Sequence, residues 1–277
     1  MKKISLISSG KLFNAYEAPK KHYIEYNDLL NDEEKFFDKV NIDGFVVLKN
    51  ALNTKTLSKL RNKYYNLFPD NYKFKNDSWH QINNPAGSHG YGNHPVKKYL
   101  KSEEFLNFAY GNQLKKIASI FLGSNETVIS KRILVRSFSK CSTFTTQAHK
   151  DSDYYVSSDQ SKAITAWVPL GPADKDHGQL IYLENSHNFS LKDYSSLNKS
   201  ERVITSDLEK LASQKSSKWL IPKIEFGDIL LHCLKIVHAS FESIKTVPRL
   251  SCDIRFAASP EFLDPRWNSF WFGEDGL

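Results

Sequence analysis

The sequence predicts a mainly β protein with helices gathered in its N-terminal half. After an N-terminal arm with little periodicity, apolar residues between about 31 and 126 recur mainly at the three- and four-residue spacing of amphipathic helices. From residue 127 onward they fall in short strand-like runs separated by polar turns, as in antiparallel sandwiches and barrels. No internal repeat or linker divides the chain. We therefore expect a single domain over residues 1–277, with an N-terminal arm (1–30), a mostly helical part (31–126) and a β core (127–277).

The composition is that of a globular protein and narrows the choice of partners. Apolar residues make up 40% of the 277 residues, which is enough for a buried core. No apolar run is long enough for a membrane span or a signal peptide, so we expect a soluble cytoplasmic protein. The formal charge of +7 comes mainly from scattered lysines, which indicates a solvated surface rather than a nucleic-acid or membrane interface. The same excess favours an anionic small-molecule ligand through long-range attraction.

Cysteine usage and missing motifs disfavour several other classes. The three cysteines, Cys141, Cys233 and Cys252, are widely spaced and form neither a disulfide framework nor a CxxC metal site. The sequence contains no HExxH motif, no Walker loop and no nucleophile elbow. Enzyme classes built on those motifs are therefore disfavoured.

Apolar spacing predicts three helices and one strand in the N-terminal half. The helices are expected over 31–40, 54–68 and 102–122, the last with a break at Gly111, and the strand over 44–52. Residues 71–95 form a long loop rich in Gly, Pro, Asn, aromatic residues and histidine. Such a loop is typical of a lid over a substrate.

Strand-like runs follow in the C-terminal half. They cover 128–138, 143–155, 163–170, 178–183 and 218–225, and a polar insertion before the last of them contains a predicted helix near 206–213. A final run at 227–256 is interpreted as two strands joined by a turn.

The polar residues of the run at 227–256 are candidates for chemistry. A period of two places His232, His238 and Ser240 on one face of its first strand, and Arg249 begins the polar face of the second. A histidine and an arginine would then face one space from neighbouring strands. Taken alone, this pair is equally consistent with a hydrogen-bonded core histidine and a surface arginine.

A second candidate lies in the run at 143–155, where His149 and Asp151 stand two residues apart. On a strand, this spacing directs the imidazole and the carboxylate to the same side, while Lys150 points away. An HxD tripeptide alone is weak evidence, because a chain of this composition readily contains one by chance. With a later histidine and arginine, it predicts a site of two histidines and one carboxylate, which binds one face of an octahedral Fe(II).

These segments resemble those of a known family. HKD at 149–151, AWVPL at 166–170 and GQLIYLENSH are similar to motifs of the phytanoyl-CoA dioxygenase-like branch of the Fe(II)- and 2-oxoglutarate-dependent oxygenases. GDILLHCLKIVHAS, followed by PRLSCDIRF and DPRW, resembles the family's last metal-ligand segment. The likeness covers roughly residues 31–267 and departs at 184–185, where Glu-Asn replaces the usual Pro-Gly. It implies a double-stranded β-helix (jelly-roll, cupin-like) core.

The resemblance implies which residues bind the metal. His149, Asp151 and His238 match the family's iron ligands. Related halogenases carry Ala or Gly in place of this aspartate, which leaves room for chloride. The presence of Asp151 therefore favours hydroxylation over chlorination.

The resemblance also implies the co-substrate contacts. Arg249 matches the arginine that binds the distal carboxylate of 2-oxoglutarate, Ser240 matches its hydroxyl partner, and Trp167 matches a tryptophan of that pocket. Members of the family use O₂ and 2-oxoglutarate to hydroxylate an unactivated C–H bond, with release of succinate and CO₂. The contacts to 2-oxoglutarate upstream of His149 are not identified by the resemblance.

Other polar residues are weaker candidates. His232 shares the face of His238 but has no serine two residues later and no arginine eleven residues later, so His238 is preferred. His177 and His187 are expected to be structural. Several residues stay open between a structural role and contact with the substrate, with a structural role favoured for the arginines of the run at 128–138: Asp153, Asp253, Arg255, Arg132 and Arg136.

The predicted substrate is a small polar metabolite, because the loop at 71–95 lacks long aliphatic runs. The closing segments are similar to those of bacterial members that tailor small natural products, including alkaloid toxin hydroxylases of the cylindrospermopsin type. Two other function classes stay open: a non-catalytic jelly-roll binding module, and a metal cupin enzyme that does not use 2-oxoglutarate. The sequence fixes neither the substrate nor the oligomeric state.

Overall fold

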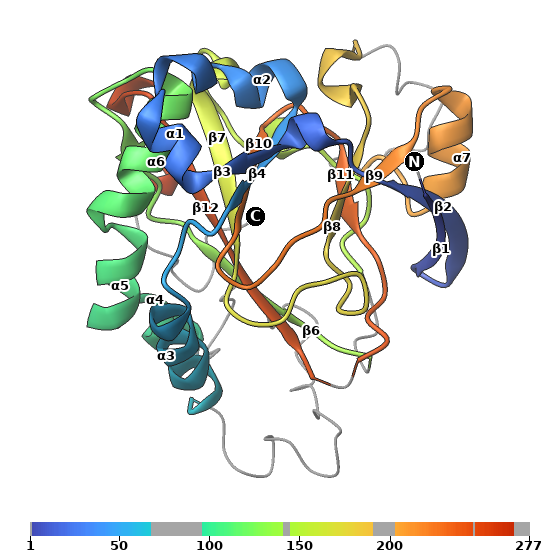
Figure 1. Cartoon of the computed structure of the whole chain (residues 1–277), viewed down its shortest axis with the longest axis horizontal. Helices are drawn as coiled ribbons and strands as arrows, with labels where there is room; N and C mark the ends of the chain where they lie inside the picture. Colours follow the sequence, from blue (N-terminus) through green and yellow to red (C-terminus); the bar gives the residue numbers. More distant parts are fainter. Residues whose placement is uncertain (1, 68–95, 141–144, 191–202, 246, 269–277) are drawn as a thin grey trace.

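Two β-sheets face each other, and helices lie on the outer side of the larger one (Figure 1). This computed structural model describes residues 2–67, 96–140, 145–190, 203–245 and 247–268. The predicted class, mainly β with flanking helices, is confirmed.

The larger sheet runs in the order β3-β4-β10-β7-β12-β5, and β6 pairs with β12 beside β5. Its neighbouring strands are antiparallel, except for the parallel pair β3 and β4. Its strands are β3 (Tyr23–Glu25), β4 (Phe45–Lys49), β5 (Val128–Ile129), β6 (Leu134–Phe138), β7 (Ala163–Pro169), β10 (Ile229–Cys233) and β12 (Arg249–Ala257).

The smaller sheet runs in the order β1-β2-β9-β8-β11. Its strands are β1 (Lys3–Ser8), β2 (Lys11–Glu17), β8 (Leu180–Leu183), β9 (Trp219–Ile221) and β11 (His238–Ser240). The N-terminal arm belongs to this sheet, because β2 pairs in parallel with β9. Ser9 and Gly10 both have positive φ and join β1 to β2 by a two-residue hairpin turn, which the sequence analysis did not predict.

The helices α1 to α6 precede β5 in the chain, and α7 follows β8. The α-helices are α1 (Tyr26–Asn31), α2 (Lys39–Asp43), α3 (Thr54–Tyr65), α4 (Val96–Leu100), α5 (Glu103–Ala109), α6 (Asn112–Leu122) and α7 (Leu208–Gln214). Short 3-10 turns are η1 (Lys20–His22), η2 (Glu34–Phe36), η4 (Asp151–Asp153), η5 (Gln160–Lys162), η6 (Ser186–Asn188), η8 (Pro260–Phe262) and η9 (Pro265–Trp267). None of the helices in the described part of the chain has the length and apolar character needed to cross a membrane.

The helix boundaries match the prediction in part. The break at Gly111 is confirmed, since it separates α5 from α6. The helix expected over 31–40 is wrong: the chain there forms η2 and then α2, with Asp38 in the left-handed region at φ 56°. Because of this kink, Phe36 is buried while Phe37 is 52% exposed, although helical spacing placed both on one apolar side.

Strand β12 separates the apolar core from a polar interior. Leu250, Cys252, Ile254 and Phe256 are buried in the main apolar cluster, together with residues of α6. The alternate residues of β12, from Arg249 to Arg255, are polar or charged and equally buried. The main apolar cluster therefore includes the helix-facing side of the larger sheet, and the space between the sheets is available for chemistry.

The run at 227–240 is not one strand, which corrects the predicted hairpin. Its first part is β10 in the larger sheet, and its last part is β11 in the smaller sheet. The chain crosses from one sheet to the other through a turn at 234–237, and β11 does not pair with β12. This crossing brings His232 and His238 together from opposite sheets, with ring centroids 4.7 Å apart.

The strand predicted over 143–155 is also shorter than expected. Ala148 and His149 form isolated bridges, and the 3-10 turn η4 begins at Asp151. Lys150 is still extended, so His149 and Asp151 lie near each other as predicted, although a turn replaces the second half of the strand. Residues 143–144 of this run and the loop at 71–95 lie outside the described residues.

Two glycines with positive φ allow the cost of a steric overlap to be compared with the cost of the backbone conformation alone. Gly178 has φ 69°, and a Cβ there would overlap the backbone carbonyl oxygen of Phe241. Gly10 has a similar φ of 74°, but no atom lies within 4 Å of the position of a Cβ. We expect Gly10→Ala to lower the free energy of unfolding by about 1–2 kcal/mol, and Gly178→Ala by about 3 kcal/mol or more. Chemical denaturation measures both values, and equal losses would contradict the prediction.

Candidate metal centre

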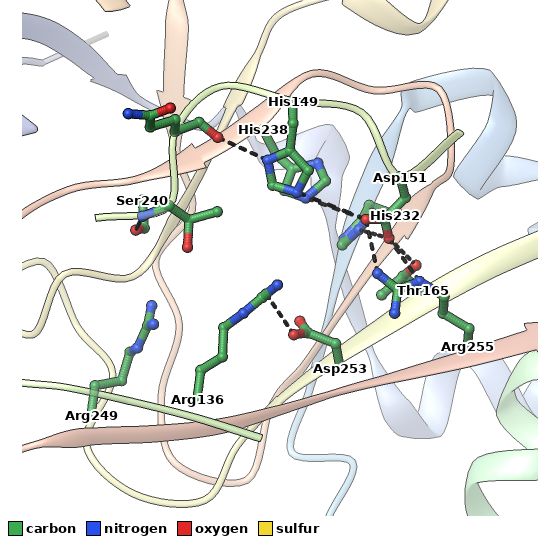
Figure 2. Close-up of polar contacts among 12 residues, drawn as sticks. Arg136, His149, Asp151, Thr165, His232, His238, Ser240, Arg249, Asp253 and Arg255 are labelled. Atoms are coloured by element: carbon green, nitrogen blue, oxygen red, sulfur yellow. Dashed lines mark hydrogen bonds and ion pairs between the residues drawn. The ribbon is translucent and has the colours of Figure 1, made fainter. Parts of the chain in front are cut away.

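Three buried side chains converge between the sheets (Figure 2). Among the described residues, His149, Asp151 and His238 offer nitrogen and oxygen atoms that all lie within 4.8 Å of one another. Backbone geometry sets this position: the N–H of each histidine donates to the carbonyl oxygen of the other, both at 3.0 Å. The two imidazoles therefore lie side by side, with ring centroids 4.2 Å apart.

Both imidazoles have a defined tautomer. Nδ1 of His149 lies 2.8 Å from the carbonyl oxygen of Gln147, and Nδ1 of His238 lies 3.1 Å from that of Ile236. Because a carbonyl only accepts hydrogen bonds, each Nδ1 carries the proton and each Nε2 presents a lone pair. Burial lowers the pKa of His149 and holds the pKa of His238 well below its usual range. Both rings are therefore neutral at neutral pH.

The Asp151 carboxylate is held by an ion pair and a hydroxyl group. Nη2 of Arg255 lies 2.9 Å from Oδ1, and Nε lies 3.2 Å from Oδ2. The Thr165 hydroxyl donates to Oδ2 at 2.6 Å. Burial acts to raise the pKa of Asp151, but the Arg255 guanidinium outweighs it and holds this pKa well below its usual range. Asp151 is therefore ionised.

Oδ1 of Asp151 is the oxygen nearest the two lone pairs. It lies 3.9 Å from Nε2 of His149 and 3.8 Å from Nε2 of His238. Two neutral imidazole nitrogens and one carboxylate oxygen that face one point are the donor set of the non-haem Fe(II) oxygenases. The residues present therefore fit a ferrous ion.

His232 lies beside this group but is not part of it. Its Nδ1 is 3.0 Å from the Tyr182 hydroxyl, and its Nε2 is 3.5 Å from Oδ2 of Asp151, the oxygen turned away from the other histidines. The geometry agrees with the preference for His238 over His232.

A buried cation lies across the space from the histidines (Figure 2). Arg249 donates from Nη1 to the carbonyl oxygen of Gly178 at 2.6 Å, while its Nε has no hydrogen-bond partner among the described residues. Its guanidinium lies against the rings of Phe138 and Trp167, 4.7 and 5.4 Å from their centroids. Burial lowers the pKa of Arg249 to about 9. A buried cation without an acidic partner is a site for an anion.

Two serines accompany Arg249. Ser240 is buried, and its hydroxyl oxygen accepts a hydrogen bond from the backbone N–H of Thr146 at 2.8 Å. Ser251, two residues after Arg249 on the same face of β12, is buried and its hydroxyl has no partner among the described residues. Ser251 was not among the residues predicted from the sequence, although the period of two that places Arg249 on the polar face of its strand places Ser251 there as well.

Four of the five charged residues left open by the sequence fall into three ion pairs. Arg255 pairs with Asp151, as described above, and Arg136 pairs with Asp253 through Nη1 and Oδ2 at 2.7 Å. The Arg136 side chain points to Asp253 in the same interior as Arg249 and the histidines (Figure 2). Asp153 is in η4 and pairs with Lys150 at 3.2 Å.

The remaining sequence candidates lie in structural contacts. Nδ1 of His177 is 2.7 Å from Asp174, and Nε2 of His187 is 3.1 Å from the carbonyl oxygen of Ile42. Glu184 and Asn185 replace the usual Pro-Gly of this turn. Asn185 adopts the left-handed conformation at φ 57°, which glycine would otherwise supply. Arg132 is buried near the start of β6.

Comparison with known proteins agrees with this geometry. The sequence model of the phytanoyl-CoA dioxygenase family matches residues 40–249. No curated protein gives a significant match.

Several solved structures have a similar fold. SnoN, a non-haem α-ketoglutarate-dependent epimerase from nogalamycin biosynthesis, is 16% identical with a TM-score of 0.60 over 82% of this chain and 84% of its own. The carbocyclase SnoK from the same biosynthesis is 14% identical, with a TM-score of 0.58 over 81% and 85%. EctD from S. alaskensis, solved with 2-oxoglutarate and 5-hydroxyectoine, is 17% identical, with a TM-score of 0.58 over 97% and 92%. At these identities the likeness concerns the fold, and it confirms the predicted double-stranded β-helix core.

Proposed function

Because the chain belongs to the phytanoyl-CoA dioxygenase family, we propose that it is an Fe(II)- and 2-oxoglutarate-dependent dioxygenase that hydroxylates a C–H bond of a small polar metabolite. One observation carries the proposal: a group of metal-binding atoms and a buried arginine that has no ion-pair partner among the described residues face the same interior between the sheets. The first fits iron, and the second fits a carboxylate of the keto acid.

The metal is assigned to His149, Asp151 and His238. Bound iron would supply the activation of O₂, coupled to oxidative decarboxylation of 2-oxoglutarate to succinate and CO₂. Three protein ligands leave the other half of an octahedral coordination sphere for co-substrate and O₂. The chain holds both imidazoles neutral and the carboxylate ionised, so that no proton has to leave before the metal binds.

The distal carboxylate of 2-oxoglutarate is assigned to Arg249. A planar guanidinium binds a carboxylate through paired hydrogen bonds, and burial strengthens the attraction. Ser240 and Ser251 would each offer a hydroxyl group to the same carboxylate, and the Trp167 ring would form a wall of the pocket. Binding of the anion removes the cost of burying Arg249 without a counter-ion.

Hydroxylation of a polar substrate is the favoured outcome for two reasons. Asp151 occupies the position at which a halogenase would bind chloride, and the Arg136–Asp253 pair gives the interior a polar wall. SnoN and SnoK share the fold but are described as an epimerase and a carbocyclase. The product identifies the reaction: hydroxylation adds an oxygen atom, epimerisation leaves the mass unchanged, and carbocycle formation removes two hydrogen atoms.

Turnover of 2-oxoglutarate tests the reaction class. We expect the purified chain, loaded anaerobically with Fe(II), to convert 2-oxoglutarate to succinate when O₂ is admitted, slowly without substrate and faster with it. Arg249→Leu should raise the KM for 2-oxoglutarate by about 100-fold or more, because it removes one partner of a buried charge pair. Arg249→Lys should lose less, since it keeps the charge and loses the paired geometry.

The same assay separates the alternatives. Turnover of a substrate that is independent of 2-oxoglutarate and indifferent to Arg249→Leu would indicate a metal cupin enzyme of another kind. Ligand binding without succinate formation over a broad metabolite panel would indicate a binding module.

A pair of histidine variants tests the ligand assignment. We expect His238→Gln to weaken Fe(II) or Mn(II) binding by at least about 100-fold, because it removes one of three ligands. His232→Gln, in the neighbouring ring, should change the affinity by less than about tenfold. Calorimetric titration under anaerobic conditions measures both. The reverse order of effects would move the site to His232.

The pH dependence of metal binding follows from the lowered histidine pKa values. Protons compete with the metal for Nε2, so the affinity falls as pH drops through the pKa of each ligand. Since burial places these pKa values below the usual 6.5, we expect nearly constant affinity from pH 8 down to about 6.5, and a loss only at lower pH. Titration of the untagged protein with Mn(II) measures this curve. A tenfold loss between about pH 7.5 and 6.5 would contradict it.

A further inference from the structure

The contacts of Asp151 reach beyond the part of the chain matched by the family model. That match ends at residue 249, whereas Arg255 and the segment 264–267 follow it. These later residues form a continuous chain of contacts that ends on the carboxylate of Asp151.

The first contact fixes which oxygen of Asp151 faces the histidines. Arg255 donates to both carboxylate oxygens, and Thr165 donates a second hydrogen bond to Oδ2. Oδ2 is thus doubly occupied by protein donors, while Oδ1 keeps a lone pair toward the two imidazoles. Rotation of the carboxylate would break three hydrogen bonds in a buried site.

The second contact fixes Arg255. Its guanidinium lies over the Trp267 ring, 4.6 Å from the centroid. Nη1 of Arg255 is buried without a hydrogen-bond partner among the described residues, so the ring face is what supports that side of the guanidinium. Tyr155 meets the same indole edge-on, with centroids 5.3 Å apart.

The third contact fixes Trp267. Asp264 is fully buried and accepts hydrogen bonds from the backbone N–H of Val156 and from Arg266. Arg266 also donates to the carbonyl oxygen of Tyr154. The segment 264–267 is thereby tied to the residues that directly follow Asp151 and η4 in the chain.

From these contacts we propose that Arg255 is a positioning residue that makes Asp151 a one-oxygen metal ligand, and that the segment 264–267 sets Arg255 through the ring of Trp267. The inference rests on the metal site of the proposed function. It assigns to the C-terminal segment a part in metal binding although none of its residues contacts the metal. A carboxylate limited to one oxygen leaves the third open position of the metal free for O₂.

Arg255→Lys tests the first half of the proposal. Lysine keeps the positive charge but lacks the planar pair of N–H donors that binds both oxygens side by side, so the variant isolates orientation from charge. We expect Mn(II) affinity, measured without 2-oxoglutarate, to fall about 10- to 100-fold. Thr165→Val, which removes the other donor to Oδ2, should give a smaller loss in the same direction.

Lys49→Met is the control for general destabilisation of the larger sheet. Lys49, on β4 of the same sheet, pairs with the buried Asp228 and lies outside the contacts of Asp151. We expect this variant to lose stability but to keep wild-type metal affinity. If Lys49→Met weakens metal binding as much as Arg255→Lys, the effect is general destabilisation and the proposal is overturned.

Two substitutions of Trp267 test the second half and do not depend on Arg255→Lys folding. The indole Nε1 of Trp267 has no hydrogen-bond partner among the described residues, so Trp267→Phe keeps the ring face and loses no hydrogen bond. Trp267→Leu removes the ring. We expect the Phe variant to bind Mn(II) within about threefold of wild type and the Leu variant to lose about tenfold or more.

A second readout separates positioning from simple occupancy. At saturating Fe(II) and 2-oxoglutarate, with no other substrate added, Trp267→Leu and Arg255→Lys should form succinate more slowly than wild type, because a carboxylate free to offer both oxygens would compete with O₂ for the metal. Equal metal affinity and equal rates of succinate formation in wild type, Arg255→Lys and Trp267→Leu would overturn the inference alone. A wild-type chain that binds no metal would overturn the proposed function, and this inference with it.

Discussion

The ion pair between Asp151 and Arg255 is the interaction on which the rest of the site depends. A carboxylate buried beside two neutral imidazoles would protonate unless a cation compensated it, and it would then lose its value as a metal ligand. Removing one partner of such a pair costs about 3–5 kcal/mol, because the other charge stays buried. The same contact therefore stabilises the fold and keeps the ligand ionised and oriented.

Strand β12 connects the two ends of this chemistry. Its inward residues place Arg249 at one end and Arg255 at the other, with Ser251 and the Arg136-paired Asp253 between them. Six residues of extended chain span roughly 20 Å, so the rise of one strand sets the spacing between Arg249 and Arg255, which holds the Asp151 carboxylate. The outward residues of β12 pack in the apolar core. One face of β12 thus sets the spacing of the buried polar residues, and the other face packs in the apolar core.

The sequence points to residues that the structure brings together, but it does not predict the route by which they meet. The spacing of His149 and Asp151, the later His238, and Arg249 eleven residues after it indicate one site, and the structure places all four around the space between the sheets. The crossing at 234–237 was missed because no glycine or proline marks it, and apolar residues continue through it as they would in a buried strand. A period of two describes a strand but does not say to which sheet it belongs.

The partner of Arg255 could not be predicted from the local sequence pattern. Arg249 and Arg255 lie on the same face of β12. The residues next to them in the sequence do not show that Arg255 pairs with a carboxylate of the protein, whereas Arg249 has no such partner among the described residues. The distinction comes from register: Arg255 lies opposite Thr165 on β7, which places both donors on Asp151, whereas Arg249 lies opposite Phe138 on β6, whose aromatic ring offers no counter-charge. Two arginines in one strand therefore differ in role because their cross-strand partners differ, and those partners are far away in the sequence.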